Sequence, residues 1–254
     1  MAMAEEFVKR MMSDTRLRTF FVLAVAVVGI ALRADAGIIT VPPGLAPGSQ
    51  YRLVFVTANT YTAASSNIAD YNTDVNSEAN TIAALAALGT TWTVIGSTES
   101  VNAITNIGAD LGIPIYGLDG NQVAVDAGTD SGGLFGSAPL LAPIGSTENG
   151  TIPFPWVWTG AGTSPPPAAC TPYCLGDTAP MFGYSGATSS NWYYFDYEGN
   201  NQTYSLYAVS GQLTVPSGVP EPTTTVMLTL GGAILIGARR RMVHRNNRAT
   251  RTLC

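Results

Sequence analysis

The stretch YRLVFVTANTYTAASSNIADYNTDVNSEANTIAALAALG, residues 51–89, has the clearest periodic pattern in the chain. Its first seven residues, 51–57, alternate in polarity and carry β-branched side chains, which is typical of a strand. Beyond Ser65 and Ser66, which offer an N-cap, apolar residues recur every three or four positions: Ile68, Tyr71, Val75, Ala79, Ile82 and Ala86. This spacing predicts one face of a helix that ends near Gly89.

The rest of the chain up to residue 218 has short strand patterns separated by turns. Residues 90–97 (TTWTVIGS) resemble a strand, and residues 113–125 (IPIYGLDGNQVAV) resemble a hairpin around Asp119-Gly120. Four further strand candidates alternate with Gly- and Pro-rich segments: residues 157–163, 181–186, 191–199 and 205–215. We therefore expect the α+β class, with an antiparallel β-rich single ectodomain, one main helix and long loops.

The charges of the chain are concentrated at its ends. Between residues 37 and 219 the only basic residue is Arg52, and there are twelve acidic residues, so this segment carries 1 − 12 = −11. A domain without a cluster of Lys and Arg cannot neutralise phosphates, which excludes nucleic acid as a partner. The only histidine, His244, lies near the C-terminus, so His-dependent catalysis and His-ligated zinc are excluded in the ectodomain.

The N-terminal segment has the pattern of a secretory signal. Four basic residues between 9 and 18 precede the uncharged run TFFVLAVAVVGIAL, residues 19–32, and Ala34-Asp35-Ala36 follows. Fourteen apolar residues are fewer than the roughly 20 that a spanning helix needs, so we predict a cleaved signal peptide at 1–36 rather than an anchor. The export machinery is therefore a predicted partner.

The C-terminal segment combines three features in a fixed order. A box formed by Val219, Pro220, Glu221 and Pro222 is followed by a charge-free run, residues 223–238, and then by Arg239, Arg240 and Arg241. Sixteen residues of helix would span about 24 Å, which with snorkelling arginines predicts a marginal transmembrane helix. The basic tail at 242–254 would then lie in the cytoplasm, and residues 37–218 outside.

These C-terminal features resemble the PEP-CTERM sorting signal over residues 219–241. The resemblance implies recognition and cleavage by a membrane-embedded exosortase-type processing enzyme. The mature protein would then pass from the cell envelope to the cell surface or to the extracellular exopolysaccharide matrix. The thirteen residues that follow the arginines depart from the usual pattern.

The order of the ectodomain elements resembles the C-type-lectin-like or endostatin-like group. In that group an opening strand leads into a helix, a Trp-x-Gly-type segment follows, a loop carries another Trp, and a closing strand pairs with the first. The matching positions are residues 51–57, 67–88, 157–160, 191–192 and 206–209. The long-range cysteine pair and the Glu-Pro-Asn calcium box of that family are missing, so calcium-dependent sugar binding is not implied.

Cys170 and Cys174 are the only cysteines in the exported segment. Their spacing and an oxidising compartment predict a local disulfide, because a redox-active pair would have two intervening residues and a βαβ context.

The candidate ligand contacts are Trp158, Trp192, Asp196 and Glu198, because aromatic rings could stack on sugars and carboxylates could hold a cation. The alternative for the aromatic residues is a place in the core. A calcium ion is the one cofactor that these oxygens could hold, although no EF-hand or RTX motif is present. We assign no catalytic residue and expect a non-catalytic structural or ligand-binding module, with polysaccharide as a candidate ligand. The alternative is a secreted carboxylate-based hydrolase such as a glycosidase, which needs two carboxyl groups across a cleft.

Overall fold

The computed structural model describes residues 37–109, 112–161 and 170–217. The predicted signal peptide (1–36), sorting signal (219–241) and basic tail (242–254) lie outside these residues. The chain divides into two compact units, one formed by residues 1–45 and 50–213 and the other by residues 46–49 and 214–254. In the described part of the second unit, the N–H of Gly48 donates to the carbonyl of Val215 at 2.9 Å.

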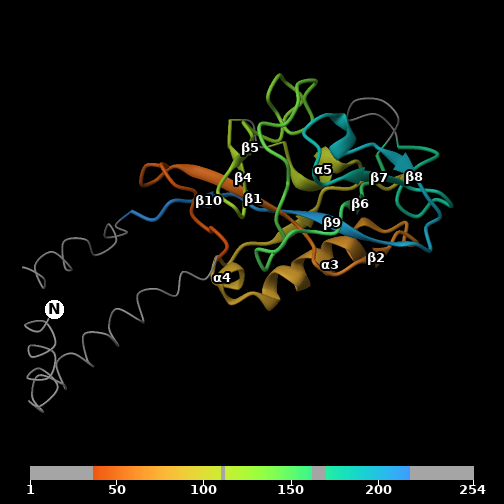
Figure 1. The fold of residues 1–254 in the computed structure, drawn as a ribbon, viewed down its shortest axis with the longest axis horizontal. Helices are drawn as coiled ribbons and strands as arrows, with labels where there is room; N and C mark the ends of the chain where they lie inside the picture. Colours follow the sequence, from red (N-terminus) through yellow and green to blue (C-terminus); the bar gives the residue numbers. More distant parts are fainter. Residues whose placement is uncertain (1–36, 110–111, 162–169, 218–254) are drawn as a thin grey trace, which may run out of the picture. The chain divides into compact units, whose positions relative to one another are not determined.

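The described residues form ten strands, three α-helices and one short 3-10 helix (Figure 1). The strands are β1 (Gln50–Val56), β2 (Tyr61–Thr62), β3 (Trp92–Val94), β4 (Ile115–Gly117), β5 (Gln122–Ala124), β6 (Trp156–Trp158), β7 (Met181–Tyr184), β8 (Asp196–Tyr197), β9 (Thr203–Ser210) and β10 (Leu213–Thr214). The helices are α3 (Ile68–Thr81), α4 (Ala83–Ala86), α5 (Ala103–Ile107) and η1 (Ser190–Trp192).

The sheet is mixed, so the prediction of an antiparallel domain with one main helix is wrong. The strand order is β5-β4-β1-β9-β6-β7-β8, and β2 and β3 also pair with β9. The β1–β4 and β6–β9 pairs are parallel, whereas β1 pairs antiparallel with β9. Parallel neighbours need a long crossover connection, and here the connection from β1 to β4 contains all three α-helices. The sheet therefore depends on pairings between distant segments that local patterns do not indicate.

The predicted helix at 67–88 is divided at Ile82, whose backbone is extended with φ −98° and ψ 112°. Helix α3 begins at the Asn67 cap, whose side chain accepts a hydrogen bond from the N–H of Ala69, and α4 follows the interruption. Tyr71, Val75 and Ala79 are buried as the periodicity predicts. Within the described ranges no helix is long and apolar enough to cross a membrane, and the predicted transmembrane helix falls in the residues not described.

The two faces of the sheet are covered differently. Helix α3 packs on β3 and β9 on one face of the sheet (Figure 1). On this face Phe55 and Trp92 meet edge to face with ring centroids 5.0 Å apart. The other face carries the large apolar cluster, which includes Val54, Val157 and residues of α5 and of the connecting loops. Since side chains alternate along a strand, the face that α3 covers continues across β6 and β7, beyond the helix.

Arg52, the one basic residue between residues 37 and 219, is buried on β1. Its exposed fraction is 2%, and its guanidinium donates to the carbonyl oxygens of Ser210, Ile107 and Gly108 at 2.7, 2.8 and 3.3 Å. These bonds satisfy a buried cation and fasten the end of α5 to the central strands.

Candidate functional site

Aromatic side chains gather on one face of the β6–β7–β9 part of the sheet. We call this set the aromatic face; it consists of Phe154, Trp156, Trp158, Phe182, Tyr184, Phe195 and Tyr204. Its rings form a continuous network of contacts, with Trp158 and Tyr204 4.5 Å apart, Phe182 and Tyr204 5.1 Å apart, and Trp156 and Phe195 5.2 Å apart. Such edge-to-face and offset contacts add stability beyond the burial of area.

The strand register produces this arrangement. Trp156 lies opposite Tyr184, and Trp158 lies opposite Phe182. Because paired residues share a face and neighbouring residues alternate, these four rings point to one side. Val157, between the two tryptophans, faces the large apolar cluster instead.

The aromatic face has a buried inner part and an exposed outer part. Trp158 is fully buried, and its indole N–H donates to the carbonyl of Tyr61 at 2.9 Å. Phe154, Tyr184 and Phe195 have exposed fractions of 45, 39 and 46%, and half-buried Trp156 lies against both Phe195 and Tyr184. The inner rings thus hold the outer rings in place at the surface, where they can contact a ligand.

Asp196 and Glu198 lie on or beside the exposed edge strand β8. Asp196 pairs with Phe182 in the β7–β8 ladder, so it shares the side of the sheet on which the aromatic face lies. Burial raises the pKa of the Tyr204 hydroxyl, and the negative charges of Glu198 and Asp196 raise it further. Both carboxylates are exposed and accept hydrogen bonds only from nearby backbone N–H groups, of Tyr197 and Gly199, among the described residues.

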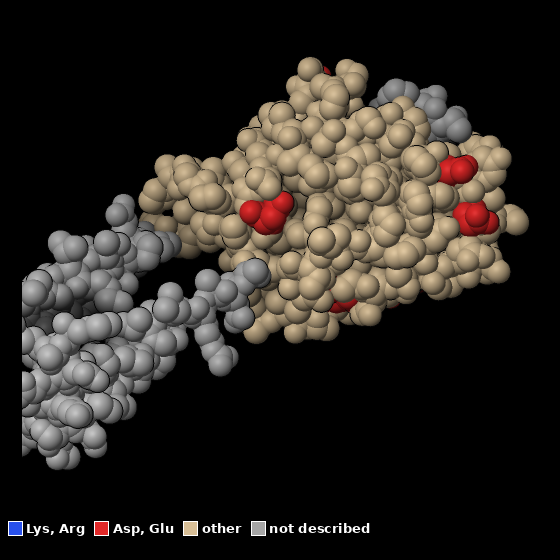
Figure 2. All heavy atoms as spheres, viewed as in Figure 1, with Lys and Arg blue, Asp and Glu red and all other residues tan. Residues whose placement is uncertain are grey.

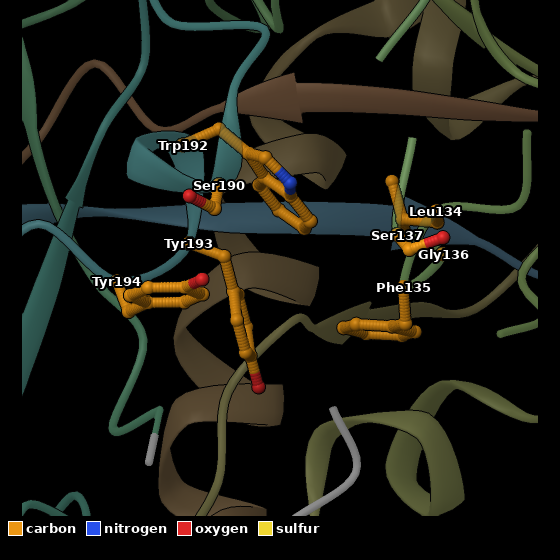
Figure 3. Close-up of a pocket in the computed structure, with 8 residues that line it drawn as sticks. All are labelled: Leu134, Phe135, Gly136, Ser137, Ser190, Trp192, Tyr193 and Tyr194. Atoms are coloured by element: carbon orange, nitrogen blue, oxygen red, sulfur yellow. The ribbon is translucent and has the colours of Figure 1, made fainter. Parts of the chain in front are cut away.

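Trp192 lies away from the aromatic face, in the large apolar cluster. It is 5% exposed and lines a small cavity of about 110 Å³ between η1 and the loop around Phe135. Figure 3 shows the rings of Trp192, Tyr193 and Phe135 around this cavity, with Ser137 at its edge. The predicted contacts Trp158 and Trp192 therefore occupy different sites in the core, while Asp196 and Glu198 are at the surface.

A second site consists of two buried carboxyl groups, Glu78 on α3 and Glu148 in the loop before β6. Their exposed fractions are 6 and 3%. Glu78 accepts hydrogen bonds from the side chain of Asn59 at 2.9 Å and from the hydroxyl of Tyr61 at 2.8 Å. Glu148 accepts one from the N–H of Ala58 at 2.9 Å.

The Glu148 carboxyl is buried within reach of the charge of Glu78, which favours its protonated form. Burial raises the pKa of Glu148 to about 7, and the charge of Glu78 and a hydrogen bond with it add to the rise. The pKa of Asp74, one turn earlier on α3, is also raised, first by burial and then by the charges of Asp70 and Glu78. This pair therefore carries less negative charge at neutral pH than two free carboxylates would.

The predicted disulfide is confirmed: Cys170 and Cys174 are bonded, with their Cα atoms 4.9 Å apart. Both cysteines are buried, and the N–H of Cys174 donates to the carboxylate of Asp177 at 2.7 Å. Within the residues that the structure describes, no group of three or more His, Cys, Asp or Glu side chains is arranged to hold a metal ion.

Two features of these sites were missed in the sequence. Glu78 lies seven residues after Tyr71 and three after Val75, so the helical period alone places this carboxyl on the buried face. Trp156 and Trp158 are two residues apart, which is the strand period and predicts one shared face. The partner of each feature, Glu148 or Phe195, is distant in sequence and has no local signal.

A comparison with protein-family models finds none that matches the chain, and a search of curated proteins finds no relative.

Proposed function

We propose that this chain is exported, that its C-terminal segment is a sorting and processing signal, and that its ectodomain is a non-catalytic module that binds polysaccharide at the cell surface or in the extracellular matrix. The order of signal peptide, Val219–Pro222 box, apolar run and Arg239–Arg241 supports export and sorting by an exosortase-type enzyme.

The single observation that carries the binding function is the exposed outer part of the aromatic face. Phe154, Trp156, Tyr184 and Phe195 present ring surfaces to solvent next to one another, which suits the apolar faces of successive sugar rings. Monomeric soluble domains seldom leave several large aromatic rings together at the surface without a ligand or partner.

The arrangement of carboxyl groups favours binding over hydrolysis. A glycosidase needs two carboxyl groups across a cleft that admits substrate. The close pair, Glu78 and Glu148, is buried and engaged with Ala58, Asn59 and Tyr61, whereas Asp196 and Glu198 lie on an exposed edge strand. A non-catalytic module does not need either pair of carboxyl groups for catalysis.

The test is a binding measurement with the full chain, purified in a nonionic detergent, on a panel of immobilised glucan, glucosamine-type and uronate-type oligosaccharides. We expect Trp156→Ala to weaken binding about fivefold to tenfold, because one stacked ring contributes about 1 kcal/mol. Tyr116→Ala, on β4 near the opposite edge of the sheet, is the matched control and should bind like the parent chain.

Two results would overturn this proposal. One is the absence of binding to every glycan on the panel by a folded chain. The other is glycan hydrolysis that disappears in Asp196→Asn or Glu198→Gln variants, which would identify a carboxylate-based hydrolase instead.

A further inference from the structure

The outer part of the aromatic face lies in a surface with acidic and no basic side chains. Arg52 is the only basic residue between residues 37 and 219, and it is buried beneath α5 with its guanidinium bonded to carbonyl oxygens. The face of the molecule in Figure 2 accordingly shows acidic side chains and, among the described residues, no Lys or Arg. A ligand at the aromatic face therefore meets no exposed positive charge from the residues that the structure describes.

Two of the acidic side chains lie close to the aromatic rings. The β7–β8 pairing sets Asp196 beside Phe182, and Glu198 follows it two residues later on the same strand edge. The effect of both charges on the Tyr204 hydroxyl shows that they are within electrostatic reach of the ring network. Negative charge is thus fixed at the margin of an exposed aromatic surface.

This combination favours a cation as ligand. The face of an aromatic ring has a negative electrostatic potential and attracts an ammonium group, also at an exposed site. A carboxylate nearby adds to this attraction at low ionic strength and repels an anionic ligand. A neutral ligand gains from stacking alone.

We propose that the aromatic face selects positively charged glycans, that is, polymers of amino sugars with free ammonium groups, over neutral and acidic glycans. The sugar rings stack on Trp156 and Phe195, and the ammonium groups lie between these rings and the carboxylates of Asp196 and Glu198. This inference rests on the proposed function, because it names the class of glycan that the same face binds.

The test compares a glucosamine hexamer with an N-acetylglucosamine hexamer, which has the same backbone but no charge, on the full chain in nonionic detergent. We expect the glucosamine hexamer to bind about tenfold more tightly at low salt. The preference should fall to within about twofold at about 1 M salt, where the screening length is roughly 3 Å.

Paired charge variants locate the selectivity. Asp196→Asn with Glu198→Gln should reduce the preference to about twofold, because only the ammonium groups of the glucosamine hexamer gain from these two charges. Asp119→Asn with Asp130→Asn removes the same net charge from exposed positions near the β4–β5 edge, and this control should keep the preference.

The outcomes separate this inference from the proposed function. Equal binding of both hexamers overturns the charge selectivity and leaves the binding function intact, whereas no binding of either hexamer or of the other glycans refutes the binding function itself. Glucosamine binding that Trp156→Ala leaves unchanged, or that a lysine hexamer matches, indicates adsorption to the acidic surface and also overturns the selectivity.

Discussion

Replacing Glu148 by Gln removes the group that titrates within the Glu78–Glu148 pair. The amide oxygen of Gln can still accept the hydrogen bond from the N–H of Ala58, and its NH₂ group can donate to Glu78. The variant thus keeps the shape and the hydrogen bonds of the protonated pair and loses only the second negative charge. Its effect on stability should depend on pH.

The sign follows from the raised pKa. Glu148 holds its proton up to about pH 7 in the folded chain, whereas it releases it near pH 4.5 in the unfolded chain, so the folded state binds more protons between these values. The stabilisation is complete below pH 4.5 and is lost as the pH rises to about 7. The full shift corresponds to about 3 kcal/mol, of which about 2 kcal/mol falls between about pH 5.5 and pH 8.

Solvent reduces this pH-dependent stabilisation. The pair contacts Ala58 and Asn59, which are exposed, so water screens the repulsion between the two carboxylates. We therefore expect the parent chain to lose about 1 kcal/mol between about pH 5.5 and pH 8, or about 3 °C in Tm for a domain of this size.

Thermal unfolding of the full chain at the two pH values measures the effect. Glu148→Gln should melt about 3 °C higher than the parent at about pH 8 and within about 1 °C of it at pH 5.5. Glu99→Gln, which removes one exposed carboxylate elsewhere, controls for net charge, and the absence of histidine between residues 37 and 217 leaves few other groups that titrate in this window. Equal melting temperatures for the parent at both pH values, or an unchanged pH slope in the variant, would refute the raised pKa of Glu148.

Two further changes test the packing around the candidate site. In Gly183→Ala, the new Cβ on β7 would lie 1.9 Å from the carbonyl oxygen of Trp192, so we expect a loss of about 3 kcal/mol in urea unfolding. Gly145→Ala, whose Cβ would approach no atom closer than 3.9 Å, should change stability by less than about 0.5 kcal/mol, and equal losses in the two variants would contradict the argument. The Cys170–Cys174 disulfide closes only a short loop and constrains the unfolded chain little, so its reduction should lower the free energy of unfolding by at most about 2 kcal/mol. A loss well above that value would mean that the stability of the whole domain depends on this loop.

The sequence predicts the elements that depend on local periodicity. The strand at 51–57 and the helix that begins near Ile68 follow from alternation and from helical spacing, and both are present in the structure. The break at Ile82 was not predicted, because its apolar side chain fits the helical pattern on both sides. The parallel pairings, β1 with β4 and β6 with β9, join segments whose proximity only the completed sheet determines.

The candidate site was predictable only in part, because it too depends on pairings between segments that are distant in the sequence. Aromatic residues in the second half of the domain were expected to be either stacking surfaces or core, and composition does not distinguish the two. Strand register does: Trp158 is enclosed beneath β2, while Trp156, two residues earlier, reaches the edge where Phe195 and Tyr184 are exposed. Glu78 and Glu148 are seventy residues apart in the sequence, and no local pattern predicts that they belong to one site.

The burial of Arg52 has a consequence for the resistance of the folded domain to proteases. Proteases of the trypsin type cut after Lys or Arg in a segment that can extend into their active site. The only such residue between residues 37 and 219 lies in the central strand β1, with its guanidinium bonded to Ser210, Ile107 and Gly108. In the folded state the segment between residues 37 and 219 therefore has no accessible cleavage site for these enzymes. Its digestion requires global unfolding.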